Sequence, residues 1–555
     1  MADVVKPSNS GFFLSGHLHL SCYKEENISR LQQTILTLIC IVFILAPPTS
    51  AKERGDKFLI IHADAISAED FFAELEAGYL PNIAYLFQDG QQVRHGLTLY
   101  PGGTEIIMPR IKAGLDNSQG NSVGWGYLDR DQDKEVGLMP VFLEMFAEFP
   151  RRSRHHFAIG LPPLHHLAGL SLLNLDRIWE TQDVAEFYWF HSDVAGHMFG
   201  REEHLKSLRT LDYYLGLVAK SGRLEGANIV LYADHGMVTQ GVEVFKYREL
   251  VSEVVQDALR FVDYPNIYLN DSSQREELAK RMVAETAIDL ALVKVSSDRM
   301  RGYTAQGSFD VVHQDGKYAY SFTGVDYFGY EKLGCADVFL SKEEWLRQTK
   351  EHRYVAIPPN FYNYLSNPQV GDIVAILDSP KILHALTAMK GNHSGVTSTD
   401  LVVPLLLTGP AFEELKPIQE FWLHELYSVH LPMIDVSAKE QRERHRLSLG
   451  YPAQLELSLS PVARWRGGVG VTESAISPWL EYDLYSSFLS RMWLGVNWSQ
   501  HGLGWQMRME AFLGDFSLSW LKRQRDEGEL CFHWRFTEQA ELTVAKARAG
   551  VSIIF

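Results

Sequence analysis

The sequence contains few cysteines, and we therefore do not expect a framework of disulfide bonds to stabilise the fold. Only 4 cysteines occur in 555 residues. Two of them, Cys22 and Cys40, lie in the first part of the chain, and the other two, Cys335 and Cys531, are far apart without a metal-site spacing. Because 46% of the residues are hydrophobic, we expect a buried core and not a disulfide framework to stabilise the protein.

The chain also lacks an excess of positive charge. It has 52 basic and 69 acidic residues, which gives a formal net charge of −17. Proteins that bind nucleic acid without sequence specificity neutralise phosphates with clustered lysine and arginine. Binding to a nucleic-acid scaffold is therefore not expected.

Long hydrophobic runs are missing as well. The clearest run, Thr34 to Ala46, is shorter than the ~20 residues that a membrane-spanning helix needs. Lys24 and Arg30 precede it, and a small-x-small cleavage pattern ending at Ala51 follows it, as in a signal peptide. We therefore predict a leader over residues 1–51 and export to the periplasm or outer membrane; a buried helix is the alternative.

From Lys52 onward, short apolar runs alternate with helical segments such as Arg201 to Ser221. The runs typical of buried parallel strands are Phe58 to Ile61, Glu186 to Phe190, Asn228 to Tyr232 and Leu401 to Leu407. The alternation predicts a doubly wound, mainly parallel α/β sheet over residues 52–436.

Aspartates stand at or just after the ends of three of these runs. They are Asp64, Asp193 and Asp234. Ligands of open α/β sheets bind beyond the carboxyl ends of the strands, so these carboxylates are expected to converge. A single aspartate in such a position could equally be a helix cap, but three of them favour a functional site.

Histidines accompany two of the aspartates. Asp193 and His197 are four residues apart near the start of a helix, so both can face one metal ion. Asp234 is followed directly by His235, and His393 lies between two glycines in a Gly-Asn-His-Ser-Gly loop. Most of the 21 histidines lack such a context and are expected to be structural.

At these residues the chain resembles the alkaline phosphatase superfamily, on the branch of type I phosphodiesterases and nucleotide pyrophosphatases. The matching phrases follow the order of the family and extend from about Lys57 to Pro410. They are LPNIAYLFQDG, YPGGT, FHSDVAGHMFG, LYADHGM, GNHSG and VPLLLTGP. The resemblance implies an alkaline-phosphatase-like catalytic domain over residues 52–436 that hydrolyses phosphoric esters.

The resemblance also implies two divalent metal ions, usually zinc, although aspartate and histidine accept manganese or iron as well. One ion would be held by Asp193, His197 and His393. The other would be held by Asp64, Asp234 and His235 together with the Thr104 oxygen. Coordination favours the alkoxide of a threonine, and so Thr104 would be the nucleophile, at the start of a helix whose amide groups face the phosphate. The alternative for Thr104 is an ordinary helix N-cap.

The segment after Thr104 departs from the family pattern, because proline follows only at Pro109. The phrase MPRIKA is similar to the corresponding helix of ethanolamine phosphate transferases in glycolipid anchor synthesis. Ser122, in a Gly-Asn-Ser-Val-Gly phrase, is a minor candidate nucleophile because it is faintly similar to the serine of metal-dependent phosphoglycerate mutases.

Three functions are compatible with these residues. The favoured one is metal-dependent hydrolysis of phosphodiesters or phosphomonoesters through a phospho-threonine intermediate. A phosphoethanolamine- or phosphoglycerol-type transferase on the same scaffold is the first alternative. A non-catalytic metal-binding module is the second, and the retained ligand set disfavours it.

The pattern changes after residue 436. Residues 437–450 are charged and predict a linker, and residues 451–555 alternate strictly between apolar and polar positions. One face of a predicted strand carries Leu503, Trp505, Met507 and Met509. Such alternation indicates an antiparallel β domain, either a small outer-membrane barrel or, slightly favoured because some strands look short, a soluble sheet packed on the catalytic domain.

Overall fold

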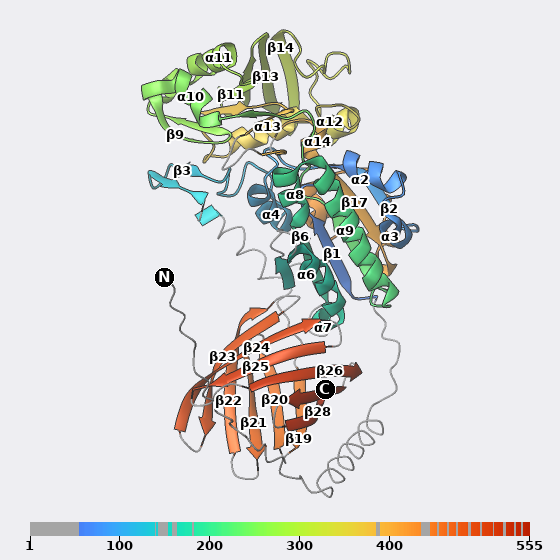
Figure 1. Ribbon diagram of the computed structural model, residues 1–555. Helices are drawn as coiled ribbons and strands as arrows, with labels where there is room; N and C mark the ends of the chain where they lie inside the picture. The colour runs from blue at the N-terminus through green and yellow to red at the C-terminus, as the bar shows by residue number, and fades with distance from the viewer. Residues whose placement is uncertain are drawn as a thin grey trace, which may run out of the picture.

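The computed structural model describes residues 55–138, 140–141, 154–157, 164–179, 183–383, 389–393, 395–434 and most of 444–554 (Figure 1). The predicted leader, residues 1–51, lies outside the described residues, so export of the chain stays a prediction. No helix within the described ranges is long and apolar enough to cross a membrane.

The part of the chain before residue 436 is built around a seven-stranded sheet in the order β18-β2-β17-β7-β1-β6-β5. Its strands are β1 (Phe58–Ala63), β2 (Gln91–Leu97), β5 (Arg154–Phe157), β6 (Val184–Trp189), β7 (Asn228–Tyr232), β17 (Val402–Thr408) and β18 (Glu420–Trp422). β1, β6 and β7 are buried along their whole length, which agrees with their unbroken apolar sequences.

The centre of this sheet is parallel. β1 pairs in parallel with β6 on one side and with β7 on the other, so that the carboxyl ends of all three strands meet at one edge. β17 was predicted as a parallel strand, and this prediction is wrong, because β17 pairs antiparallel with both β7 and β2. Its buried apolar sequence is compatible with either direction, since a central strand is covered on both faces.

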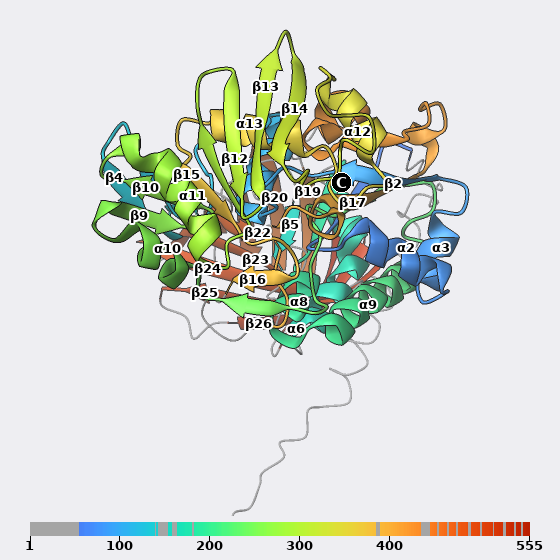
Figure 2. The same ribbon diagram turned by 90° about the horizontal axis from the view of Figure 1, so that it is seen from above.

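Helices cover the sheet, and α8 and α9 lie side by side along one of its faces (Figures 1 and 2). The helices before the second sheet are α2 (Ala68–Glu76), α3 (Pro81–Leu86), α4 (Thr104–Ala113), α6 (Leu164–Ser171), α7 (Leu175–Trp179), α8 (His191–Phe199) and α9 (Arg201–Lys220). The later ones are α10 (Tyr247–Val255), α11 (Arg275–Glu285), α12 (Lys342–Thr349), α13 (Ile357–Ser366) and α14 (Ser398–Leu401). Short turns of helix are η1 (Leu172–Asn174), η2 (Gln256–Ala258), η3 (Ser272–Gln274), η4 (Pro410–Phe412), η5 (Leu423–Glu425) and η6 (Leu426–His430).

A second seven-stranded sheet, which the sequence did not predict, is inserted between β7 and β17. Its order is β14-β13-β12-β11-β15-β10-β9, and every pairing recorded in it is antiparallel. The strands are β9 (Leu259–Asp263), β10 (Asn266–Leu269), β11 (Leu290–Lys294), β12 (Arg299–Thr304), β13 (Gly307–Gln314), β14 (Lys317–Gly324) and β15 (Ile373–Ile376). Helices α10 and α11 pack on it around a separate small core that includes Val251, Met282 and Ile373. Two small ladders join β3 (Tyr127–Asp129) with β4 (Lys134–Val136) and β8 (Glu243–Phe245) with β16 (Lys381–Leu383).

The last part of the chain forms ten antiparallel strands that close on themselves (Figure 1). They are β19 (Arg444–Tyr451), β20 (Gln454–Val462), β21 (Trp465–Thr472), β22 (Ile476–Ser486), β23 (Ser490–Ser499), β24 (Gly502–Leu513), β25 (Phe516–Arg523), β26 (Glu529–Thr537), β27 (Ala540–Ala545) and β28 (Arg548–Ile554). Closure comes from β28 pairing with β19. The prediction of a mixed α/β fold followed by an antiparallel β domain is confirmed. Part of the predicted linker 437–450 is strand, because β19 begins at Arg444 and its alternating Leu447 and Leu449 were hidden by the charged residues before them.

A buried ion pair fixes α4 to the sheet. The Lys112 ammonium, in the last turn of α4, lies 2.8 Å from a Glu186 carboxylate oxygen on β6, and both side chains are at most 3% exposed. Removing one partner of such a pair leaves a buried charge without compensation, whereas replacing both partners by apolar residues is often nearly neutral.

We therefore expect Lys112→Met to lower the free energy of unfolding by ~3–5 kcal/mol. The double variant Lys112→Met/Glu186→Leu is expected to recover most of that loss. Urea unfolding of the full chain, followed by circular dichroism, measures both. A double variant that is no more stable than the single one would show that Glu186 is not the reason for the loss.

Candidate active site

The predicted site residues lie at the edge of the central sheet where the parallel strands end. Asp64 follows β1 directly, Asp234 follows β7 by one residue, and Asp193 lies in the first turn of α8, which follows β6. Because β7, β1 and β6 are neighbours in this order, the three carboxylates converge, as the sequence predicted. Each of the three aspartates is buried.

Thr104 faces this cluster from the first residue of α4. Its Oγ1 lies 3.1 Å from His235 Nε2 and 3.5 Å from Asp64 Oδ1. Gly103, and not Thr104, occupies the N-cap position, and no side chain caps the helix. The Thr104 hydroxyl is therefore directed at the acidic cluster and does not serve as a helix cap.

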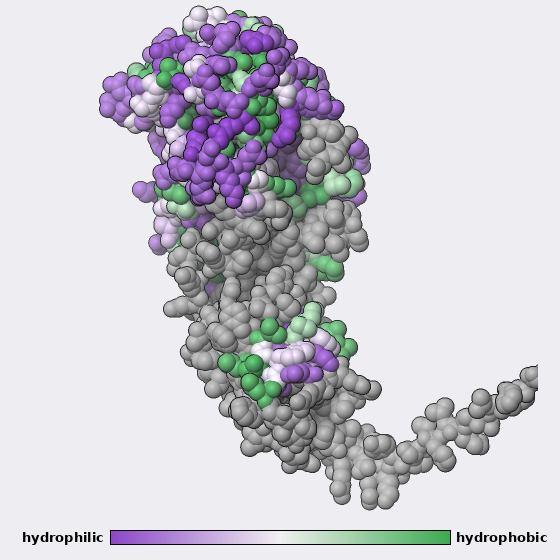
Figure 3. All heavy atoms as spheres, turned by 90° about the vertical axis from the view of Figure 1, so that its left-hand side faces the viewer, coloured by the Kyte–Doolittle hydropathy of each residue, from purple (hydrophilic) through white to green (hydrophobic). Residues whose placement is uncertain are grey.

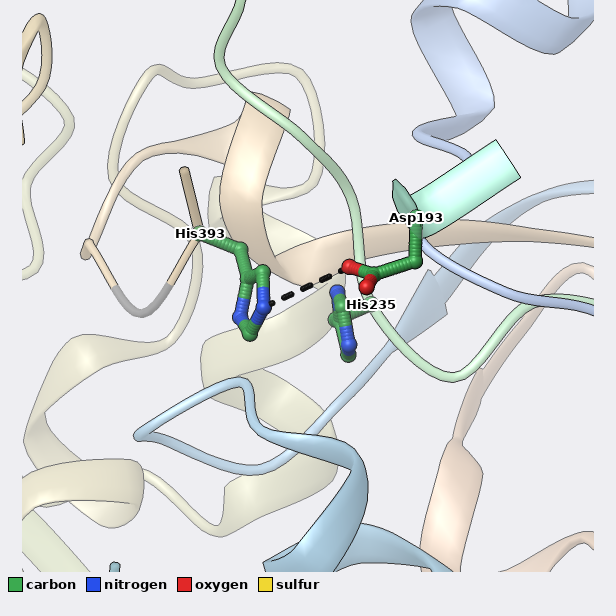
Figure 4. A group of neighbouring side chains, drawn as sticks. All are labelled: Asp193, His235 and His393. Atoms are coloured by element: carbon green, nitrogen blue, oxygen red, sulfur yellow. Dashed lines mark ion pairs between the residues drawn. The ribbon is translucent and has the colours of Figure 1, made fainter. Parts of the chain in front are cut away.

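The second group of predicted residues surrounds Asp193. His197 Nε2 lies 3.2 Å and His393 Nε2 3.6 Å from Asp193 Oδ1, and Figure 4 shows His393 beside Asp193 and His235. The Nδ1 atoms of the two histidines are engaged elsewhere, at 2.9 Å from the Gly391 carbonyl for His197 and 2.6 Å from the Gly102 carbonyl for His393. Such a contact fixes the orientation of the ring and leaves Nε2 to face the site, as in metal-binding histidines.

The two groups are joined, because the rings of His235 and His393 stack with centroids 3.9 Å apart. The structure thus brings together all the residues that the sequence proposed as ligands or nucleophile. They are Asp64, Thr104, Asp193, His197, Asp234, His235 and His393.

His62, which was not predicted from the sequence, belongs to the same cluster. His62 Nε2 lies 3.1 Å from Asp234 Oδ1, and its ring lies between the rings of Tyr188 and Tyr232. The Tyr188 hydroxyl donates a hydrogen bond to Asp64. A signal was present, since His62 stands two residues before Asp64 and alternate residues of a strand point to the same face.

Burial and the repulsion between neighbouring carboxylates disfavour the ionised form of the acids in this site. Burial, and then the charges of Asp234 and Asp193, raise the pKa of Asp64 well above its usual range. Burial also raises the pKa of Glu105, the residue after Thr104, to about 8. Burial alone would raise the pKa of Asp193, but the nearby His197 lowers it to about 2. The crowded acids therefore require compensating positive charge.

Histidine protonation does not supply all of that charge. Burial lowers the pKa of His393 well below its usual value, and the neighbouring His235 and His197 lower it further. A neutral imidazole is the form that binds a metal ion. His393 is thus held in the form that a metal ligand needs.

Among the residues that the structure describes, two sets of three side chains have donor atoms close enough to share one ion. Within each set the atoms lie within 4.8 Å of one another, and the sets are Asp193, His235 and His393, and His62, Asp64 and Asp234. Asp193 Oδ1 and Asp234 Oδ2 are buried and face imidazole nitrogens, His197 Nε2 at 3.2 Å from the first and His235 Nε2 at 3.5 Å from the second. Buried carboxylate oxygens that face imidazole nitrogens fit a shared divalent cation well. The donor set of aspartate and histidine is one that zinc accepts.

Two glycines next to the ligands allow the backbone to pack closely. A Cβ added to Gly236 would lie 1.8 Å from the Thr399 carbonyl oxygen. A Cβ added to Gly391 would lie 2.8 Å from the Gly196 carbonyl oxygen. The glycine-bounded phrases of the sequence are therefore explained by contacts between the ligand-bearing loops.

Ser122, the minor candidate nucleophile, has a different environment. Its hydroxyl donates to the Gly124 carbonyl at 3.3 Å, and its own carbonyl accepts a hydrogen bond from Arg110 at 2.8 Å. The same guanidinium donates to the Gln119 and Ile106 carbonyls. Ser122 therefore lies in a loop that hydrogen bonds from Arg110 of α4 hold against the helix.

Part of the chain that contributes to this site also matches a known protein family. Residues 144–381 match the family model "Type I phosphodiesterase / nucleotide pyrophosphatase". The chain resembles the type I phosphodiesterases of the alkaline phosphatase superfamily, and it is a phosphoric ester hydrolase. The matched residues include Asp193, His197, Asp234 and His235, whereas Asp64, Thr104 and His393 lie outside the matched range.

Two solved structures of ectonucleotide pyrophosphatase / phosphodiesterase 5 are also similar. The human protein is 14% identical with a TM-score of 0.43, and the similarity covers 68% of this chain and 94% of that one. The murine protein is 15% identical with a TM-score of 0.42 and the same two coverages. No curated protein matches the chain by sequence.

Proposed function

We propose that the protein hydrolyses phosphodiesters or phosphomonoesters with two divalent metal ions, zinc in our assignment, and with Thr104 as the nucleophile. The observation that carries the proposal is the position of Thr104 Oγ1, 3.1 Å from His235 Nε2 and 3.5 Å from Asp64 Oδ1, at the first residue of α4. A hydroxyl that is buried among acidic and imidazole groups at a helix start is placed to attack an anionic ester.

One ion would be held by Asp193, His197 and His393. The other would be held by Asp64, Asp234 and His235 with the Thr104 oxygen, and His62 would orient Asp234 from behind. This division differs from the two donor sets seen in the structure, in which His235 lies with Asp193 and His393 and His62 lies with Asp64 and Asp234. When bound, the ions would favour the threonine alkoxide and neutralise the charge that develops on the phosphoryl group and the leaving oxygen.

The residues of the chain then carry a two-step reaction. In the first step the Thr104 oxygen forms a bond to phosphorus, the bond from phosphorus to the leaving alcohol breaks, and the hydroxyl proton is lost to solvent or to the leaving oxygen. The backbone amide groups at the start of α4 would stabilise the phosphate oxygens. In the second step water attacks phosphorus, the Thr104 oxygen leaves, and phosphate or a monoester is released.

The transferase alternative differs only in the second step. An alcohol acceptor would take the place of water, and the phospho-threonine would be the same. Product analysis with and without added alcohol separates these two reactions.

The test is an assay with a bis-aryl phosphate, a mono-aryl phosphate and a phospholipid, before and after chelation and with zinc or manganese returned. We expect hydrolysis of at least one ester and a loss of ~10³-fold or more on chelation, because metal ions supply several kcal/mol of transition-state stabilisation. Acid quenching during turnover should leave phosphate on Thr104, detectable by mass spectrometry. Full activity of the metal-free protein, with no modified threonine, would contradict the proposal.

A further inference from the structure

In the closed ten-stranded sheet, the described apolar side chains of β23 to β27 lie mostly on the outside. Along β24, the outward residues Leu503 and Trp505 are 65% and 42% exposed, whereas Gln506 between Trp505 and Met507 is 1% exposed. β26 repeats the pattern, with Phe532 and Trp534 exposed and His533 buried. Figure 3 shows hydrophobic atoms on the described surface of this part of the molecule.

The outward apolar residues form a continuous band because they lie opposite one another across the strands. Val496 of β23 pairs with Trp505 of β24, and Met509 of β24 pairs with Trp520 of β25. The band continues from β25 through β26 to β27. Its further pairs are Trp520 with Leu530, Leu518 with Phe532, Phe532 with Val544, and Trp534 with Leu542. Five neighbouring strands thus share one apolar outer surface.

Most of the described inner positions of the same strands are polar. His533 contacts the Ser519 hydroxyl at 2.6 Å, the Thr543 hydroxyl at 2.8 Å and a Glu541 carboxylate oxygen at 3.2 Å. The Ser517 hydroxyl donates to Glu510 at 3.4 Å. Leu521 and Cys531 are the buried apolar side chains among the described inner positions. The interior is therefore held by hydrogen bonds and charges.

This arrangement is the reverse of a barrel that folds in water, in which apolar residues fill the interior. We propose that the outer face of β23 to β27 is in contact with the hydrocarbon of a lipid bilayer. A membrane barrel has an even number of antiparallel strands, a polar interior and an apolar outer band, and its strands are ~9–11 residues long. Here the sheet has ten strands, and β23, β24 and β26 have 10, 12 and 9 residues, whereas β25 and β27 have 8 and 6.

Two further observations favour a bilayer over a protein partner. The band follows the curvature of a closed sheet over five strands, and a fluid solvent covers such a surface more readily than a rigid partner does. Closure through β28 and β19 also leaves no strand edge for pairing with another chain. The proposal concerns the location of the enzyme and is independent of the function proposed for the Thr104 site.

The test uses the full chain, refolded in detergent and mixed with vesicles of phosphatidylcholine and phosphatidylglycerol. We expect the protein to float with the vesicles, and we expect brominated lipid to quench the outward tryptophans of the barrel. Leu503→Lys combined with Phe532→Lys should reduce the vesicle-bound folded fraction at least tenfold, because lysine on the lipid-facing surface is costly. Gln524→Lys, at an exposed turn after β25, is the matched control and should bind as the unchanged protein does.

The same lysine variants distinguish the outcomes. In a water-soluble domain, both positions are exposed, so the substitutions would leave folding unchanged and the chain would stay in the supernatant; that result overturns the proposal. Self-association in detergent-free buffer, abolished by the lysines and without vesicle binding, would assign the band to a second copy and would also overturn it. Ester hydrolysis measured on every sample reports separately on the Thr104 site.

Discussion

Thr104→Ala is expected to lower kcat by at least ~10³-fold while the metal content stays within error of that of the unchanged protein. Loss of a nucleophile removes the covalent route, and removing the nucleophile of a well-studied serine hydrolase lowers kcat by ~10⁶-fold. Metal binding should persist, because six aspartate and histidine side chains remain. Thr104→Ser keeps a hydroxyl and is expected to retain part of the activity. Steady-state kinetics and metal analysis on the same preparations measure both effects.

Ser122→Ala is the matched control for this variant. Ser122 is also a buried hydroxyl near α4, but its hydrogen bond is to the Gly124 carbonyl. We expect nearly unchanged turnover. Normal activity of Thr104→Ala combined with an inactive Ser122→Ala would place the nucleophile elsewhere and would contradict our assignment.

Asp193→Ala is expected to abolish activity and to lower the affinity for one metal ion by more than ~100-fold, the upper end of what the loss of a merely orienting group costs. Asp193 Oδ1 is the oxygen that His197 and His393 both approach, so its removal leaves two imidazoles without a carboxylate between them. His393→Ala should produce the same two losses. Isothermal titration of the metal-free protein with zinc, together with the ester assay, measures them.

A control for Asp193→Ala is available on the second seven-stranded sheet. Asp310 is a half-buried carboxylate paired with Arg299 and Arg301 on the antiparallel sheet. Asp310→Ala is expected to leave metal affinity unchanged. Full turnover and unchanged zinc affinity in Asp193→Ala would show that this cluster is not a metal centre.

The proposed site residues could be predicted from the sequence because they occur in short local motifs. Asp193 and His197 are neighbours on one helical face, Asp234 and His235 are adjacent, and His393 stands between glycines. Their convergence also followed from the sequence, since β1, β6 and β7 were predicted as buried strands and ligands gather beyond the carboxyl ends of parallel strands. His62 was missed because a histidine inside a strand is more often structural.

The second seven-stranded sheet, which contains β9 to β15, could not be predicted from the sequence. β12 and β13 alternate irregularly between buried and half-buried positions, and β10, β11 and β15 are buried runs of only 4 to 5 residues, so neither pattern predicts an antiparallel sheet. The direction of β17 could not be predicted either, because a fully buried strand has the same apolar sequence in a parallel and in an antiparallel pairing.

The α/β pattern, the residues proposed as ligands and the alternating strands of the last hundred residues could all be predicted from the sequence, because they are periodicities or short-range spacings. Which residues are neighbours in the site, and which side of the last sheet is apolar, became known from the three-dimensional structure. Thr104 and His235 are 131 positions apart, and their 3.1 Å contact depends on how the loops after β7 and before α4 pack. In the last domain, alternation fixes that Leu503 and Gln506 point to opposite faces, but closure of β28 on β19 fixes that the polar face is inside. Closure is a long-range pairing, and no local pattern encodes it.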